Sequence, residues 1–397
     1  MKNYCIDDYY SYKNGKVVYA SFQSDPRWGN RDYSVLQVLD IHTKKQYRLT
    51  SRSKYFSPDI NADGTEVLAV NVAINGTNNL HRLDAATGKL VAAIPNPGNY
   101  FFTQTKYINN SSAVSAVRHP DGRMALVKVD LTNGHTENIT PFSYNVLGYP
   151  SVKGDTVYFT MMNNGADNTF AVTLANNKIF ALTTGAGSVY YPAVNSNNEL
   201  VASAFTAAGN RLTKINLKGM AWSPVAETAV TTVAEAGADD ALKNRPGAGV
   251  LYNLADKKNP VTPYRKGGHL FSFHSWRPVL DEPEYGYTLY SDNVLSNFTN
   301  SISYTYNRND KSHTVGIGSV YAAWLPELSL TAEETFNRHA DTAIGKPPIE
   351  FNTAKLAAGI NIPLRFVGGR TSKLLNFGGS YNIEQYAYKK VTREYFQ

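Results

Sequence analysis

The chain has 397 residues, of which 18% are charged and 12% are aromatic, and it contains a single cysteine, Cys5. One cysteine excludes an intramolecular disulfide and a cysteine-based zinc site, while the low charge and high aromatic content exclude disorder, collagen and coiled coil. The net charge of +7 is spread without a block of five like charges, so no nucleic-acid partner is expected.

An internal repeat runs through the first half of the chain. A strand, a polar turn and a short strand recur at spacings of 42 to 46 residues. The turns begin at Asp40, Asp84, Asp130, Leu174 and Asn216. Several units open with aromatic residues before proline, as in Tyr55-Phe56-Ser57-Pro58, Tyr149-Pro150 and Tyr190-Tyr191-Pro192. About four strands per unit of this length is typical of a β-propeller blade, so the sequence predicts about five four-stranded blades over residues 1–217.

Residues 218–264 interrupt the repeat and are predicted to form a linker. Prolines and alanines are frequent there, and residues 227–242 have the composition of a short helix. The prolines lie at Pro224, Pro246, Pro260 and Pro263. Proline removes a backbone donor and disfavours regular structure, which is why the repeat ends here.

The segment 265–397 returns to strands, but these are longer and lack the repeat. Apolar residues alternate with hydroxyl residues along 297–307, and similar alternation continues to residue 388. A typical soluble strand has about 5–6 residues, whereas about 9–11 tilted residues cross a membrane in a β-barrel. The sequence therefore predicts an all-β chain whose second part is an antiparallel outer-membrane-type sheet. A soluble sandwich with one buried face is the alternative.

The predicted sheet has two unlike faces. One face is expected to carry Phe298, Ile302, Tyr304, Ile360, Ile362, Leu364 and Phe377 toward lipid. The other is expected to carry Ser301, Ser303, Thr305 and Thr331. Lipid cannot satisfy hydroxyl or backbone groups, so in a membrane barrel the apolar stripe must face outward.

Three segments carry a resemblance to a known family. They are residues 25–34, residues 54–60 with Asp63-Gly64, and His274-Ser275-Trp276 with Pro278. In this order they resemble large bacterial surface proteins that join a TolB-like (WD-type) β-propeller to a C-terminal outer-membrane β-barrel. The resemblance implies a periplasmic propeller and an outer-membrane location. Because the first residues contain no secretory signal and only about seven barrel strands are visible, the chain is expected to be a fragment.

The same segments supply the predicted binding residues. Arg27 and Trp28 are candidates because both residue types are enriched in binding hot spots, although Trp28 packing on a neighbouring blade is an equal alternative. The remaining candidates are Asp32, His274, Trp276 and Arg277.

Residues 59–64 resemble the start of a calcium-binding loop. Asp59, Asn61 and Asp63 match the opening of a calcium loop, but the twelfth position is Val70, which cannot ligate the ion. An Asp-Gly turn, with Asp59 accepting turn amides, is therefore the favoured interpretation. No metal and no cofactor are expected.

The absence of two common catalytic motifs argues against an enzyme. The chain has no Gly-x-Ser-x-Gly elbow and no His-Glu-x-x-His helix. We therefore expect a non-catalytic outer-membrane protein whose propeller docks a periplasmic or envelope protein or peptide, while the barrel contacts lipid as an anchor or translocation pathway. The alternative is the docking and anchoring part of a larger cell-envelope enzyme, such as a peptidase with its catalytic domain upstream.

Overall fold

The computed structural model describes residues 5–163, 165–185, 187–226, 245–247, 260, 262–263, 270–340, 348–368 and 371–389. Throughout these residues the regular elements are β-strands, and no helix suited to crossing a membrane occurs among them. The helix expected at residues 227–242 lies outside the described residues. The chain divides into two compact units: unit 1 is Met1–Ser24 with Arg31–Ala255, and unit 2 is Asp25–Asn30 with Asp256–Gln397.

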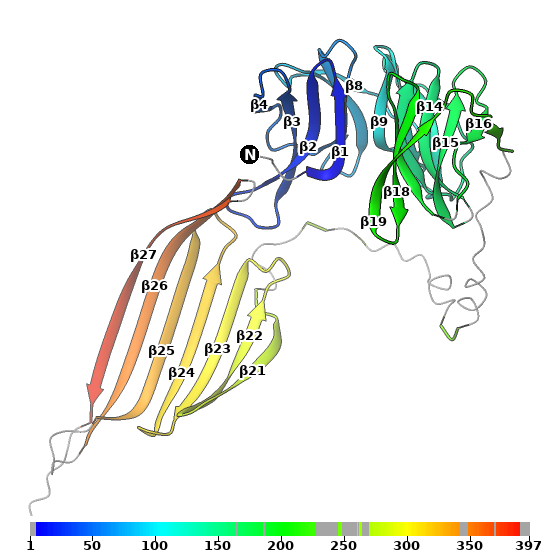
Figure 1. Cartoon of the computed structure of the whole chain (residues 1–397). Coiled ribbons are helices and arrows are strands. Elements are labelled where there is room, and N and C mark those ends of the chain that lie inside the picture. The colour runs from blue at the N-terminus through cyan, green and yellow to red at the C-terminus, as the bar shows by residue number, and fades with distance from the viewer. Residues whose placement is uncertain are drawn as a thin grey trace, which may run out of the picture. The chain divides into compact units, whose positions relative to one another are not determined.

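Unit 1 is an array of five antiparallel sheets in chain order, here called blades 1 to 5 (Figure 1). Blade 1 contains β1 (Cys5–Lys13), β2 (Lys16–Ser24), β3 (Asp32–Asp40) and β4 (Gln46–Arg48). Blade 2 contains β5 (Tyr55–Ile60), β6 (Glu66–Val72), β7 (Asn78–Asp84) and β8 (Leu90–Ile94). Blade 3 contains β9 (Phe101–Asn109), β10 (Ser112–Arg118), β11 (Met124–Asp130) and β12 (Thr136–Asn138).

The last two blades depart from four strands. Blade 4 contains β13 (Leu147–Lys153), β14 (Thr156–Asn163), β15 (Ala166–Thr173), β16 (Ile179–Ala181) and β20 (Ser223–Pro224). Blade 5 contains β17 (Val189–Val194), β18 (Glu199–Thr206) and β19 (Gly209–Asn216). The predicted repeat is confirmed, but the four-strand count holds only for blades 1 to 3.

Aromatic packing explains the exchange of a strand between blades 4 and 5. After β19 the chain does not turn back onto β19; β20 pairs instead with β16. The ring of Trp222 lies 5.5 Å from that of Phe180 and 6.2 Å from that of Tyr158, both in blade 4. These ring contacts hold the segment that contains β20 against blade 4.

Apolar clusters between blades form the core of unit 1. The first strands of consecutive blades lie beside one another, and aliphatic and aromatic side chains fill the spaces between sheets. Leu36, Leu80 and Leu126 occupy the same place in β3, β7 and β11, and each is 0% exposed. Because each blade buries one face against the next, the blades form a propeller-like array.

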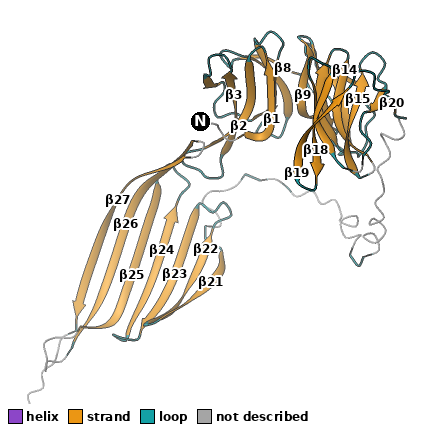
Figure 2. Cartoon of the chain, viewed as in Figure 1, coloured by secondary structure: helices purple, strands orange, loops and turns teal. Residues whose placement is uncertain are grey.

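Unit 2 is a single seven-stranded antiparallel meander in chain order (Figure 2). Its strands are β21 (Phe273–Asp281), β22 (Glu284–Asp292), β23 (Phe298–Asn307), β24 (Ser312–Tyr321), β25 (Glu327–Ala340), β26 (Ile349–Gly368) and β27 (Thr371–Tyr388). The longest, β26, has 20 residues, well beyond the usual length of a soluble strand.

The strand register separates unit 2 into two faces. One row crosses all seven strands on the apolar face: Trp276, Leu289, Ile302, Ile317, Ala332, Leu356 and Ile383. The neighbouring row on the polar face is Arg277, Thr288, Ser303, Gly316, Glu333, Lys355 and Glu384. Successive residues of a strand point to opposite faces, so the sheet has an apolar and a polar face as predicted. This row of the polar face carries four charged residues beside the hydroxyls of Thr288 and Ser303.

Candidate functional site

Arg27, a predicted binding residue, belongs to unit 2 and makes its side-chain contacts within that unit. Its Nε donates to the backbone oxygen of Leu325 at 2.6 Å, and Nη2 donates to that of Trp324 at 3.2 Å. Nη2 also lies 3.5 Å from a carboxylate oxygen of Glu327, and the side chain is 8% exposed. The Asp25 carboxylate accepts the backbone N–H groups of Arg27 and Trp28. Arg27 therefore holds the turn between β24 and β25.

The other predicted binding residues do not form one cluster with Arg27. Asp32 begins β3 in unit 1, whereas the remaining candidates belong to unit 2. His274 Nε2 lies 3.5 Å from Asp292, and Trp276 is 67% exposed on the apolar face. Trp276 and Arg277 are adjacent in β21 and so point to opposite faces. Their role in binding stays a prediction.

Asp59, the first residue of the calcium-like turn, is the centre of a buried ionic cluster. Its side chain is 1% exposed and its oxygens accept hydrogen bonds from Lys13 Nζ at 2.8 Å and Lys106 Nζ at 3.0 Å. Ser11 Oγ and the backbone N–H of Tyr107 donate to the same carboxylate at 2.7 and 2.8 Å. These partners come from β1 and β9, so the cluster joins blades 1, 2 and 3.

The charge of the cluster opposes a cation. Burial would raise the pKa of Asp59, but the ammonium groups of Lys106 and Lys13 outweigh burial and lower it, so the carboxylate is ionised and already paired. The N–H groups of the turn, those of Thr65 and Glu66, donate instead to Asn61 Oδ1. The prediction that Asp59 accepts the turn amides is therefore wrong. Within the described ranges no three His, Cys, Asp or Glu side chains form a metal-binding group.

A repeated backbone feature marks the first strands of blades 2 to 5. Each contains one non-glycine residue with a left-handed backbone: Ser57 (φ 45°), Gln104 (φ 51°), Tyr149 (φ 54°) and Tyr191 (φ 61°). At each, the pairing with the second strand shifts in register, as in a β-bulge. Such conformations cost about 1–3 kcal/mol and concentrate at functional sites, where they redirect side chains. The aromatic–proline segments of the sequence were the signal for three of them.

Three of these bulge residues line one cavity of about 600 Å³ between blades 3, 4 and 5. We call it the bulge cavity; its polar lining includes Gln104, Arg118, Tyr149, Asp167, Tyr191 and Asn210. The Tyr149 and Tyr191 rings meet edge to face with centroids 4.2 Å apart. Gln104 Oε1 accepts the Tyr149 N–H at 2.5 Å, which fixes two bulges to each other.

The chemistry of the bulge cavity suits binding. Aromatic faces, amides and one side chain of each charge can hold a peptide through stacking and hydrogen bonds. Its lining contains no histidine or cysteine, so it has no nucleophile with a histidine base. The sequence offered no means of bringing these residues together, because they come from three different repeats.

The apolar face of unit 2 is the second candidate surface. Ile317, Leu356 and Ile383 lie in its central row and are 48%, 46% and 48% exposed. A shallow depression of about 640 Å³ lies over the short side chains of Ala332 and Ala354. On the polar face Lys355 Nζ lies 3.4 Å from the Glu384 carboxylate, so that face carries paired charge as well as hydroxyls.

Comparison with solved structures gives matches of low sequence identity and low TM-score. No protein-family model and no curated protein sequence matches the chain. TolB from Acinetobacter baumannii is 11% identical over 75% of this chain and 62% of that one, with a TM-score of 0.40. A putative TolB from Agrobacterium tumefaciens is 10% identical over 90% and 98%, with a TM-score of 0.41.

The match to a peptidase has an equally low identity and TM-score. Prolyl oligopeptidase B from Galerina marginata is 9% identical over 87% of this chain and 45% of its own, with a TM-score of 0.39. The chain thus spans about three fifths of the Acinetobacter protein and less than half of the peptidase. The propeller-like description of unit 1 rests on its own sheet order and interblade packing.

Proposed function

We propose that this chain is part of an outer-membrane protein. In this proposal unit 2 contributes its seven strands to a β-barrel wall, and unit 1 lies in the periplasm and docks a peptide or protein partner. The observation that carries the proposal is the row of apolar side chains that crosses all seven strands of unit 2 without a covering layer among the described residues.

Lipid contact accounts for both faces of this sheet. Contiguous apolar surface of this extent is rare on a monomer in water. A soluble sandwich would bury it against a second sheet, but the described part of unit 2 contains one sheet. Strands of 10 residues or more in β23 to β27 are long enough to cross the hydrocarbon layer. The hydroxyl-rich opposite face suits a water-filled interior.

The partner would dock at the bulge cavity of unit 1. Rigid strands hold its lining residues, and three strained backbone positions direct side chains toward it, as expected for a preformed binding site. An extended peptide can place a ring or proline against Tyr149 and Tyr191 and a carbonyl group against the amide NH₂ of Asn210.

Two neighbouring residues of β23 test the membrane assignment. Ile302 lies on the apolar face and Ser303 on the polar face. If Ile302 lies near the bilayer midplane, Ile302→Arg should reduce the free energy of unfolding in phosphatidylcholine vesicles by about 2–4 kcal/mol, and Ser303→Arg by less than about 1 kcal/mol. Equal losses, or a wild-type chain that does not float with vesicles in a density gradient, would contradict the membrane role.

A peptide library tests the docking role separately. Immobilised hexapeptides are screened with the full chain in detergent micelles, and Tyr191→Ala is compared with Tyr144→Ala. Tyr144 is 63% exposed and does not line the bulge cavity. Peptides retained by the wild type and by Tyr144→Ala should be lost with Tyr191→Ala; equal retention by the two variants would exclude the cavity as the docking site.

A further inference from the structure

The outer edge of β19 differs from the corresponding edge in every other blade. In blades 1 to 4 the third strand pairs on its outer side with a short fourth strand, β4, β8, β12 or β16. β19 pairs with β18 along its whole length, from Asn216 opposite Glu199 to Gly209 opposite Thr206. Among the described residues no strand pairs with its other side, because β20 lies in blade 4.

The backbone groups at this edge are identifiable from the register. Leu217 N–H donates to Asn198 O, so the odd-numbered residues of β19 bond toward β18. Alternate residues of an antiparallel strand point their backbone groups to opposite sides. Asn210, Leu212 and Lys214 therefore direct their backbone N–H and C=O groups outward.

The same groups are paired in other blades. Four residues before the end of the third strand, Leu36 O accepts the N–H of Leu49 at 2.8 Å, and Leu126 O accepts that of Ile139 at 2.9 Å. Leu212 occupies this place in β19, and no described residue donates to its oxygen. Its side chain also differs, because Leu36 and Leu126 are 0% exposed and Leu212 is 83% exposed.

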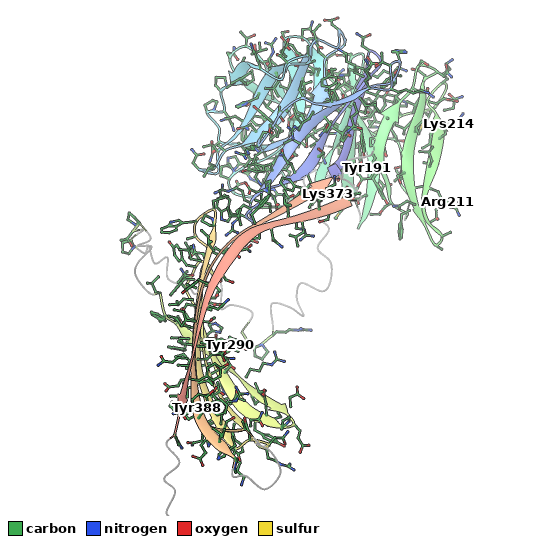
Figure 3. The ribbon with its side chains drawn as sticks, turned by 90° about the vertical axis from the view of Figure 1, so that its left-hand side faces the viewer. Tyr191, Arg211, Lys214, Tyr290, Lys373 and Tyr388 are labelled. Atoms are coloured by element: carbon green, nitrogen blue, oxygen red, sulfur yellow. The ribbon has the colours of Figure 1, made fainter. Side chains whose placement is uncertain are left out.

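The charge near this edge has one sign. From residue 209 to residue 220 the chain carries Arg211, Lys214 and Lys218 and no acidic residue. Figure 3 shows Arg211 and Lys214 on the outermost strand of blade 5. Lys214 pairs with Glu199 on β18 at 2.8 Å, and the charge of Lys218 also helps to lower the pKa of Glu199. One carboxylate thus faces two ammonium groups, and with Arg211 the charge near the edge is net positive. A second copy of β19 placed against this edge would bring like charges together, whereas an acidic strand would be attracted.

We propose that the outer edge of β19 accepts an extended acidic segment of a partner protein as the fourth strand of blade 5. The backbone of Asn210, Leu212 and Lys214 pairs with the added strand, an apolar residue of that strand covers Leu212, and its carboxylates face Arg211 and Lys218. Strand addition of this kind draws its affinity from main-chain hydrogen bonds and its selectivity from side chains. The proposal does not involve the membrane face of unit 2, and it shares one residue with the bulge cavity, Asn210, of which it uses only the backbone.

Peptide binding by the full chain in detergent micelles tests the proposal. The probe is a fluorescein-labelled heptapeptide that alternates Glu with Val and Leu, followed by anisotropy. Leu212→Pro removes one outward N–H but leaves the bonds to β18, because proline is tolerated at a strand edge. It should weaken binding at least tenfold, whereas the control Leu212→Val keeps the N–H and should stay within threefold of wild type. A probe with Lys in place of Glu should bind at least tenfold more weakly.

Residue-resolved hydrogen exchange shows where the peptide binds and that the variant is folded. Without peptide, the amides of Asn210, Leu212 and Lys214 should exchange fast and those of Arg211 and Thr213 slowly, also in Leu212→Pro. With peptide, the first three should become protected.

Four results would overturn the proposal. The first is equal affinity of wild type and Leu212→Pro, and the second is protection of the outward amides without peptide, which would mean that another part of this chain covers the edge. The third is a homodimer that Leu212→Pro dissociates while the peptide does not bind. The fourth is binding lost with Tyr191→Ala but kept with Leu212→Pro, which would move the peptide to the bulge cavity. None of them bears on vesicle flotation or on the Ile302→Arg comparison, so the membrane role fails or stands separately.

Discussion

Replacing Asp59 by Asn removes the charge at the centre of the cluster that joins blades 1, 2 and 3. The amide is isosteric with the carboxylate but retains one acceptor oxygen, and its NH₂ group must face an ammonium or an N–H donor. Lys13 and Lys106 would lose their counter-ion while their side chains are 33% and 14% exposed.

The size of the loss follows from this geometry. Removing one partner of a buried ion pair costs about 3–5 kcal/mol. Because Lys13 is partly exposed, its ammonium can reach water, so Asp59→Asn should lower the free energy of unfolding by about 3 kcal/mol. The matched control is Asp63→Asn, four residues along the same turn, where the carboxylate is exposed and accepts from Asn110. A surface change of this kind costs less than about 0.5 kcal/mol.

Urea unfolding, followed by hydrogen-exchange mass spectrometry of peptides from blades 1 to 3, measures the free energy of unfolding of both variants.

The pH dependence of the same free energy is a second test. Because the pKa of Asp59 is lowered in the folded state, its stabilisation is complete above the unfolded value of about 3.9 and disappears as pH falls through the folded value. The gap between wild type and Asp59→Asn should therefore close in strong acid. A gap below about 1 kcal/mol at pH 7, or one that widens as pH falls, would refute this account of the cluster.

Further predictions compare matched positions by urea unfolding. Gly134 has φ 78° and a Cβ there would lie 2.1 Å from the Pro95 backbone oxygen, so Gly134→Ala should cost about 2 kcal/mol or more; Gly154→Ala, with φ 58° and open space, should cost about 1 kcal/mol. Equal losses would show that the close approach is relieved by backbone movement. Leu36→Ala should cost about 2–5 kcal/mol and Leu212→Ala less than about 0.5 kcal/mol, because these equivalent positions are 0% and 83% exposed; a large loss at Leu212 would mean that its side chain is covered.

The sequence was sufficient for the features that recur locally. Polar turn residues repeat after each third strand, so the regular spacing of the turns predicted the blades. The structure differs only in the fourth turn, which begins at Thr173 and not at Leu174. Alternation along β23 was enough to assign both faces of unit 2, because a strand has a side-chain period of two.

The sequence was not sufficient where contacts join different repeats. Lys13 and Lys106 lie 46 and 47 residues from Asp59, and no local pattern links them. For the same reason β20 was not foreseen: its short sequence does not show which of two sheet edges it pairs with. In the structure β20 pairs with β16 and the Trp222 ring packs on Phe180, contacts that exist only in the folded chain.

The return of the chain to blade 4 through β20 makes blade 5 an insertion. The chain leaves blade 4 after β16, forms β17, β18 and β19, and comes back to pair with β16. Blade 5 is thus enclosed in a loop whose two ends are held by the same sheet. A tension applied to the chain beyond β20 must first peel this two-residue strand and the Trp222 indole from blade 4 before it reaches blade 5, so β20 acts as a mechanical latch that sets the order in which the two blades detach.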